Sequence, residues 1–328
     1  MIETDNLSGD LKISRIINGM WQVAGGHGYI DPSKAVSEMQ QYHDSGLNTW
    51  DMADIYGPAE EFFGNFHKKF KSNDELIGLT KFVPNPGPMN KNFVNRAIKN
   101  SILRMDVPSL DLVQFHWWDY EDLSYLDALE HLTSLRDEGK IRHIGLTNFD
   151  TKRMEIILEK GYRIVSNQVQ YSIIDQRPQV EMEAFCKKHN IKLLAYGTIG
   201  GGLISEKFLN HSEPTRIELN TYSLQKYHNM IDVWGGWRLF QKLLDVLASI
   251  AKNHNTSIVN VATRFILDKP CVSAVIIGTR LGISQHISAT LDTFSLQLTV
   301  DEKKMIQEIT LQSNNLFEHI GDCGSEYR

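Results

Sequence analysis

The chain has 328 residues, of which 41% are hydrophobic and 23% are charged, and its formal net charge is −6. This composition is ordinary for a globular protein, and the length is enough to bury a large core. The mildly acidic balance argues against a general affinity for nucleic acid or anionic membranes. Its apolar runs are shorter than the roughly 18 residues that a membrane-spanning helix needs. The sequence therefore predicts neither a membrane protein nor a nucleic-acid-binding protein.

Cysteine usage and the N-terminus indicate the compartment. Cys186, Cys271 and Cys323 are odd in number, far apart and in no CxxC pair. They suggest neither a disulfide framework nor a zinc site, so we expect a reducing compartment. Residues 1–6 lack the basic and apolar regions of a signal peptide. Together these features favour a cytoplasmic protein.

Short apolar runs alternate with longer segments of helical periodicity. Eight runs are predicted as strands, at residues 15–21, 49–51, 76–81, 110–115, 141–146, 165–170, 191–196 and 272–277. Helices are predicted at residues 31–44, 59–70, 90–105, 125–138, 152–159, 178–189, 238–253, 257–267, 284–291 and 300–310. Eight strand-then-helix units predict an α/β fold, a (β/α)8 TIM barrel that forms a single domain over residues 1–328.

Two segments interrupt the regular pattern. Residues 206–237 show no clear period and are predicted to form a long excursion after the seventh strand. Loops after strands form the catalytic rim of such a barrel, and an unusually long one is commonly functional. The polar, glycine-bearing tail at residues 321–328 is not expected to form a packed element.

Several predicted strands end in side chains that can transfer or bind a proton. Asp51 ends the second strand and Tyr56 lies in the following turn, while Lys81 and His116 end the next two strands. Each alone has a structural interpretation: a turn cap, a packed ring, a solvated charge or a core histidine. Because the C-terminal ends of parallel barrel strands share one rim, we expect the four side chains to meet there.

In order and spacing, these four residues resemble the Asp, Tyr, Lys and His tetrad of the aldo-keto reductases. The resemblance extends from about residue 19 to about residue 290. It implies reversible reduction of aldehydes or ketones to alcohols by hydride transfer. Tyr56 would donate the proton, Lys81 with Asp51 would lower its pKa, and His116 would orient the carbonyl.

The nucleotide-binding motifs GxGxxG and GxxxxGK[ST] do not occur, since the glycine runs at 25–28 and 200–202 lack the required spacing. The family resemblance instead implies that a nicotinamide dinucleotide binds across the rim. The implied nicotinamide-side contacts are Gly19, Met20, Trp21, Asp51, Thr147, Asn148, Gln168, Tyr196 and Gly197. Gly197 stands where the family frequently has serine.

A segment near the C-terminus resembles the part of the family that binds the adenosine phosphate. It comprises Gly278, Thr279, Arg280, Ser284 and Gln285. The planar fork of Arg280 suits a phosphate monoester, and a helix beginning near Ser284 would offer free N–H groups to an anion. These features favour NADPH/NADP over NAD.

The substrate pocket is expected to be aromatic, because Trp117 and Trp118 directly follow His116. With Trp21, Tyr56 and His116 they form the predicted contacts to a small-molecule carbonyl. Trp50 is predicted to be a core residue. In relatives the C-terminal segment can fold over the rim, so we hypothesise that the tail lines or gates the pocket.

Two other functions remain open at this point. A docking or regulatory protein could keep the fold and the cofactor with little catalysis. A barrel hydrolase is disfavoured, because no metal-ligand spacing such as HExxH occurs and no metal is expected. Monomeric and homo-oligomeric states are both compatible with the sequence.

Overall fold

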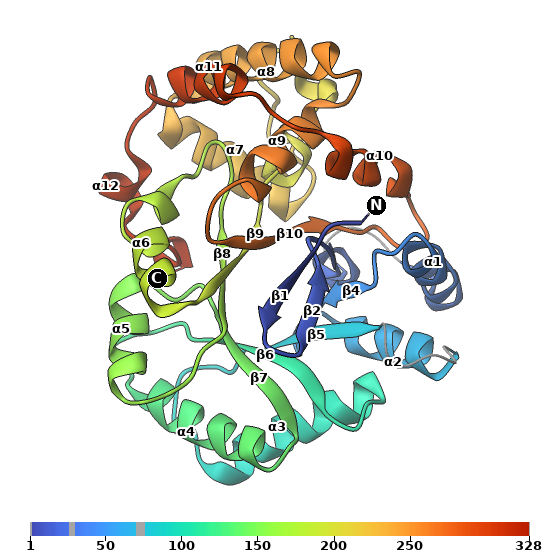
Figure 1. The fold of residues 1–328 in the computed structure, drawn as a ribbon, viewed down its shortest axis with the longest axis vertical. Helices are drawn as coiled ribbons and strands as arrows, with labels where there is room; N and C mark the ends of the chain where they lie inside the picture. The colour runs from blue at the N-terminus through green and yellow to red at the C-terminus, as the bar shows by residue number, and fades with distance from the viewer. Residues whose placement is uncertain (1, 26–29, 70–75, 328) are drawn as a thin grey trace.

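The computed structural model describes residues 2–25, 30–69 and 76–327. Its centre is a closed barrel of parallel strands in the order β10-β3-β4-β5-β6-β7-β8-β9, surrounded by helices (Figure 1). The strands are β1 (Thr4–Ser8), β2 (Leu11–Ser14), β3 (Ile16–Gly19), β4 (Thr49–Asp51), β5 (Ile77–Phe82), β6 (Leu110–His116), β7 (Ile141–Thr147), β8 (Ser166–Gln170), β9 (Lys192–Tyr196) and β10 (Val272–Gly278). The predicted TIM barrel is confirmed.

Helices follow the barrel strands in the predicted alternation. They are α1 (Pro32–Asp44), α2 (Ala59–Lys69), α3 (Lys91–Met105), α4 (Ser124–Asp137), α5 (Thr151–Glu159), α6 (Met182–His189), α7 (Tyr222–Trp234), α8 (Gly236–Asn253), α9 (Ile258–Leu267), α10 (Ile287–Asp292), α11 (Val300–Thr310) and α12 (Leu316–Ile320). Short 3-10 turns include η1 (Trp21–Ala24), η3 (Arg177–Gln179), η5 (Glu206–Phe208) and η7 (Ser325–Tyr327). Within the described ranges, none of the helices has both the length and the apolar character to cross a bilayer.

Capping side chains explain why some helices begin where predicted. Asp31 accepts hydrogen bonds from the backbone N–H groups of Ser33 and Lys34 at the start of α1. Thr299 and Glu302 form a reciprocal capping box at the start of α11. Both caps satisfy N–H groups that have no partner within the helix.

The parallel register brings the polar strand ends to one rim of the barrel. Asp51 at the end of β4 pairs with Gly19 of β3 and Leu79 of β5. His116 at the end of β6 pairs with Thr147 at the end of β7. The residue types singled out in the sequence therefore meet at the C-terminal edge of the sheet, where active sites of this fold lie.

The antiparallel hairpin β1-β2 is not predicted by the sequence analysis. Its Leu7, Leu11 and Ile13 belong to one buried cluster with side chains inside the barrel, among them those of Ile17, Leu79, Leu112, Leu194 and Ala274. Asp10 in its turn pairs at 2.8 Å with Arg142, near the start of β7. The hairpin, drawn across the barrel in Figure 1, thus covers the N-terminal mouth, opposite the rim.

Three predictions for the second half of the chain differ from the structure. Residues 206–237 do lie in a long insertion after β9, but this insertion contains the helix α7. The helix expected from Ser284 begins at Ile287. The tail is packed, since Cys323 is fully buried and residues Ser325–Tyr327 form a 3-10 turn.

Near the N-terminus the differences are smaller. The first barrel strand ends at Gly19, so Trp21 begins a 3-10 turn and is not a strand residue. The helix predicted over residues 59–70 is described as far as Lys69, and Phe70 lies outside the described residues. Of the glycine-rich run at 25–28, only Gly25 is within the described part.

Candidate active site

A buried ion pair lies at the rim. Lys81 Nζ donates to Asp51 Oδ2 at 2.6 Å and to the backbone carbonyl of Met52 at 3.0 Å. Each side chain of the pair is only 4% exposed. Burial lowers the pKa of the Lys81 ammonium, and the Asp51 carboxylate opposes that shift. Because a buried charge is tolerated only when it is paired, these two side chains fix each other.

Two glutamine amides complete the surroundings of Asp51. Its Oδ1 accepts hydrogen bonds from Gln114 Nε2 at 2.8 Å and from Gln168 Nε2 at 2.7 Å. Gln168 Nε2 also lies 2.7 Å from Gln114 Oε1. Gln168, expected to hold a nicotinamide carboxamide, is thus also a support of the carboxylate.

Tyr56 lies beside this pair. The Lys81 ammonium is 4.9 Å from the centroid of its ring, and Trp21 packs edge-on against the ring at 5.0 Å. Burial raises the pKa of the Tyr56 phenol well above its usual range, and the charge of Asp51 adds to the rise. Desolvation thus sets the net direction of this pKa, and a lowering contribution from Lys81 stays a prediction.

His116 is buried and oriented by the neighbouring strand. Its Nδ1 lies 3.0 Å from the carbonyl oxygen of Thr147. A carbonyl can only accept, so Nδ1 carries the proton in this hydrogen bond. Trp118 packs edge-on against the imidazole, with ring centroids 4.3 Å apart.

Trp117 is not brought to these side chains. It is fully buried and packs against Phe115 at 5.9 Å. Its indole N–H donates to the carbonyls of Asp119 and Asp122 at 2.6 and 2.9 Å. The predicted substrate contact by Trp117 is therefore wrong, since successive strand residues point to opposite faces. Trp50, also fully buried, is a core residue as predicted.

The residues expected to hold a nicotinamide lie together at the ends of β7, β8 and β9. Thr147 Oγ1 and the Asn148 N–H both donate to the carbonyl of Gln168, at 3.2 and 2.9 Å. Asn148 has a left-handed φ of 59°, and its Oδ1 accepts a hydrogen bond from the Tyr196 hydroxyl at 2.9 Å. An amide side chain therefore lies beside an aromatic ring at the rim.

The surroundings of Gly197 explain why a glycine stands where the family frequently has serine. Its φ is 72°, and an added Cβ would collide with the hydroxyl of Tyr227 on α7. A serine at this position would meet both the backbone strain and the tyrosine. The presence of α7 at the rim thus accounts for the glycine.

The expected backbone turn forms where β3 meets β10. Thr279 donates to the Gly19 carbonyl from both its N–H, at 2.8 Å, and its hydroxyl, at 2.9 Å. A Cβ on Gly19 would lie 2.8 Å from Ile276, and one on Gly278 would overlap the Gln22 side chain. Both glycines therefore permit a close approach that larger residues would block.

The two residues that follow Gly19 join this turn to the ion-paired centre. Met20 is fully buried, and its N–H donates to the Asp51 carbonyl at 3.0 Å. Trp21 is 40% exposed and reaches Tyr56. The structure thus brings Gly19, Met20 and Trp21 to the same rim as the other predicted residues.

The segment expected at the adenosine phosphate has a different local structure from the prediction. Arg280 and Ser284 form an antiparallel bridge, and Gln285 donates to Gln41 at 2.6 Å. Arg280 is exposed. Because α10 starts only at Ile287, the helical N–H groups do not begin at Ser284, and of the two features expected to bind a phosphate only the exposed Arg280 is present.

The tail reaches this rim, held by a buried arginine. Arg177 is 1% exposed and pairs with Asp175 at 2.8 Å and with Glu326 at 2.9 Å. Tyr327 then lies with its hydroxyl 3.0 Å from that of Tyr196 and its ring 6.3 Å from His116. The C-terminal segment is therefore a wall of the candidate site.

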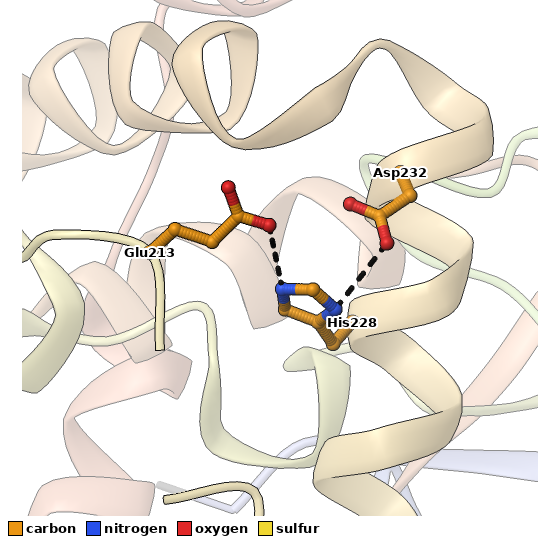
Figure 2. Close-up of side chains that lie close together, drawn as sticks. All are labelled: Glu213, His228 and Asp232. Carbon is orange, nitrogen blue, oxygen red and sulfur yellow. Dashed lines mark ion pairs between the residues drawn. The ribbon is translucent and has the colours of Figure 1, made fainter. Parts of the chain in front are cut away.

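A second group of titratable side chains lies on α7 and the segment before it (Figure 2). Glu213 and Asp232 approach opposite nitrogens of His228, at 3.2 Å from Nε2 and 3.4 Å from Nδ1. One ligand atom from each of the three residues lies within 4.8 Å of the others, and the two carboxylates hold the ring between them as a clamp. His228 also stacks on Trp237 at 5.9 Å. The clamp ties residues before α7 to the helix.

Sequence reasoning missed three polar side chains around the site: Gln114, Asp54 and Lys226. Gln114 precedes His116 by two residues in one strand, and this period predicts that both face the barrel interior. Asp54 lies between Asp51 and Tyr56 in the sequence, but only its burial distinguishes it. Lys226 had no signal, because its helix was not predicted.

Comparison with known proteins agrees with this geometry. The sequence pattern described as the aldo/keto reductase family matches residues 15–311. An aryl-alcohol dehydrogenase from Pestalotiopsis microspora is 25% identical over 311 residues, covering 89% of this chain and 76% of that protein. An aldo-keto reductase from Bacillus subtilis is 25% identical over 328 residues, with 95% and 93% covered.

A solved structure, the glycerol dehydrogenase from Gluconobacter oxydans, shares the fold. Its TM-score is 0.78 at 23% identity, with 98% of this chain and 96% of that chain covered. The match to the family pattern spans most of the sequence, including all four tetrad positions. The chain therefore belongs to the aldo/keto reductase family, whose chemistry is oxidoreduction at carbonyl and alcohol groups.

Proposed function

We propose that this protein is an NADPH-dependent reductase of aldehydes or ketones, acting reversibly. The observation that carries the proposal is the buried Asp51–Lys81 pair beside the Tyr56 ring, on the rim that also holds His116. A docking protein with little catalysis has no need to bury this ion pair, which costs desolvation. We also propose a cytoplasmic, reducing setting, which the three free and buried cysteines support.

In this proposal Tyr56 gives the proton to the carbonyl oxygen. A donor must be protonated before the reaction, and the raised pKa of the phenol keeps it so through neutral pH. The Lys81 ammonium, 4.9 Å from the ring centroid, then stabilises the negative charge left on the oxygen. Asp51 and its two glutamine partners hold the ammonium in place.

His116 would bind the carbonyl oxygen from the side opposite Thr147. Since Nδ1 donates to the Thr147 carbonyl, a neutral ring would present Nε2 as an acceptor. Donation from Nε2 to a substrate carbonyl therefore requires the imidazolium form. A positive ring would polarise the carbonyl more strongly than a neutral one.

The residues at the rim fit a nicotinamide dinucleotide. Asn148 offers an amide beside the Tyr196 ring, and Gly19 with Gly278 allows a close backbone approach. Thr147, Gln168 and Gly197 adjoin this pair, and Arg280 is the exposed cation for a phosphate monoester. When bound, the cofactor supplies the hydride to the carbonyl carbon.

The direct test is Tyr56→Phe, assayed with NADPH and a panel of aldehydes. The substitution keeps the ring but removes the proton donor, so we expect turnover to fall by about 100-fold or more. NADPH binding, followed by its fluorescence, should stay within about 3-fold of wild type. Turnover of Tyr56→Phe equal to that of wild type would rule out the mechanism.

The cofactor preference rests on Arg280. Arg280→Ala should weaken NADP far more than NAD, because only NADP carries the extra phosphate. We expect about a 10-fold or larger rise in the KM for NADPH, with NADH little changed. Arg238→Ala, on α8, is the matched control. Equal losses for the two cofactors would refute the phosphate assignment.

A further inference from the structure

Lys226 of α7 brings a positive charge to the proposed active site. Its Nζ donates a hydrogen bond to the Tyr327 hydroxyl and lies 4.4 Å from the centroid of that ring. The same Nζ is 5.4 Å from the ring centroids of Tyr196 and Tyr227. The Tyr327 ring packs edge-on against His116, with centroids 6.3 Å apart. One side chain therefore separates the ammonium from the proposed carbonyl-binding histidine.

The hydrogen bonds around this ammonium run in one direction. An ammonium only donates, so the Tyr327 hydroxyl accepts from Lys226. The Tyr196 hydroxyl donates to Asn148 Oδ1 at 2.9 Å, so it accepts from Tyr327 at 3.0 Å. Each tyrosine hydroxyl is thus used as both donor and acceptor. The chain ends on a neutral amide, so these hydrogen bonds bring no anion to Lys226.

Nearby carboxylates are already engaged elsewhere. Among the residues that the structure describes, none forms an ion pair with Lys226, whereas Glu326 is paired with Arg177 at 2.9 Å. Burial opposes ionisation of Glu326, yet Arg177 and, more weakly, Lys226 hold its pKa below the usual range. Lys226 therefore acts on Glu326 only through space and forms no ion pair with it.

The ammonium is also held in position. Lys226 is half-buried on a helix whose first turn is capped by Thr221. Two residues further on, His228 is clamped between Glu213 and Asp232 (Figure 2). The helix is thus fixed, and the hydrogen bond to Tyr327 restrains the ammonium itself, which reduces the conformational entropy lost when it binds a ligand.

We propose that Lys226 selects carbonyl substrates that carry an anionic group, a carboxylate or a phosphate. This inference rests on the reductase function proposed above and names its substrate class. A half-buried ammonium that forms no ion pair with any described residue gains a charge-assisted hydrogen bond from an anionic substrate. A neutral substrate forms no charge-assisted hydrogen bond that would offset the desolvation of the ammonium.

The experiment compares two matched substrates, a benzaldehyde with a para carboxylate and its methyl ester. Their reacting aldehydes are alike, and only one carries a charge. Wild type should show the higher kcat/KM for the carboxylate. Lys226→Met keeps the aliphatic stem and should lower that value by about 10- to 100-fold, with the ester within about 2-fold.

Two further variants separate the charge from other effects. Lys226→Arg keeps the charge and should retain the preference for the carboxylate. Lys242→Met removes an exposed charge on α8 and should change neither substrate. Equal losses for the carboxylate and the ester in Lys226→Met would overturn the proposal and indicate a structural role. A raised KM for NADPH with no distinction between the aldehydes would overturn it in favour of a cofactor contact.

A binding measurement keeps the inference separate from the proposed reaction. The alcohols that correspond to the two aldehydes are titrated calorimetrically into the protein saturated with NADPH, a pairing in which no hydride can be transferred. The carboxylate alcohol should bind more tightly to wild type than its ester, and Lys226→Met should abolish the difference. Without NADPH-dependent turnover of either aldehyde the reductase proposal fails, while this binding difference still decides the role of Lys226. The absence of any difference in wild type refutes it.

Discussion

The Asp54 carboxyl shows how strongly burial alters one side chain. It accepts a hydrogen bond from the Val83 N–H at 3.2 Å, and burial raises its pKa from 3.8 to about 6. The folded protein thus binds this proton more tightly than the unfolded chain does. The resulting stability is fully present below about pH 3.8 and is lost as the pH rises through about 6.

We therefore expect Asp54→Asn to change the pH dependence of stability. Asparagine cannot ionise but can still accept from Val83, so the variant should lack the loss of stability between about pH 4 and pH 6. Relative to wild type it should gain on the order of 1–3 kcal/mol across this window. Urea unfolding at several pH values measures the difference. As a control, Asp245→Asn, at an exposed position, should show the same pH dependence of stability as wild type. If Asp54→Asn also shows the pH dependence of wild type, the Asp54 carboxyl does not titrate between about pH 4 and pH 6 and the prediction is wrong.

At this scale the sequence predicts which side chains reach the rim but not their protonation. Asp51, Lys81 and His116 are predictable because each lies at or next to the end of a strand of the barrel. The pKa of Tyr56 is not, because its direction depends on how much water the fold removes. Trp117 fails for a related reason: its neighbour His116 faces the site, so it must face away.

At some positions, contacts between elements determine the residue type, and the pattern of the strand or helix alone does not explain it. Gly197, at the end of β9, lies against Tyr227 of α7. The helix itself escapes prediction because its buried face includes Tyr227 and His228 among the apolar positions Leu224, Ile231 and Trp234. These positions do follow helical spacing once the polar-tipped rings are counted as buried.

Gly197→Ala should reveal this contact between β9 and α7. The new methyl group meets a left-handed φ and the Tyr227 hydroxyl, so we expect a loss of about 1–3 kcal/mol in the free energy of unfolding. Displacement of α7 should also weaken NADPH binding. Gly161→Ala is the matched control, since its φ is 85° and nothing lies within 4 Å of the added Cβ. Equal losses for the two variants would mean that the Tyr227 contact contributes nothing.

The two ends of the barrel have different roles. The N-terminal end is closed by structural packing, and the C-terminal rim holds the candidate site. At the N-terminal mouth the β1-β2 hairpin buries Leu7, Leu11 and Ile13 against the inside of the barrel. The candidate site occupies the other end of the same strands. A change in the hairpin should therefore affect stability without affecting chemistry.

Leu11→Ala tests this division. Leu11 is fully buried, so we expect a loss of about 2–5 kcal/mol of stability from lost burial and the cavity that remains. The kcat with an aldehyde should be unchanged at temperatures well below the melting transition. Leu103→Ala, at a position 63% exposed on α3, should have little effect on either quantity. A loss of kcat in Leu11→Ala without loss of stability would contradict the separation.

At this scale the alternation of strands and helices was sufficient to predict the barrel. It could not reveal the hairpin, whose strands are short and precede the first repeated unit. It also gave the wrong expectation for the tail, because the packing of residues 321–327 depends on Arg177 and not on their own apolar content. When a segment is buried through contacts with residues distant in the sequence, its own sequence shows no periodic apolar pattern that would predict the burial.

The junction of β3 and β10 has a consequence for how the molecule assembles and persists. It joins Gly19 to Thr279, residues separated by 260 positions, so the ring can close only after nearly all of the chain is available. The closure entropy of such a long loop must be offset by contacts formed at that late stage. On the β3 side the junction contains Gly19, and on the β10 side it contains Gly278 and Thr279. A dinucleotide bound there, as proposed, would contact both strands of the junction and stabilise the closed barrel against opening. The lifetime of the folded enzyme would therefore lengthen as the cofactor concentration rises.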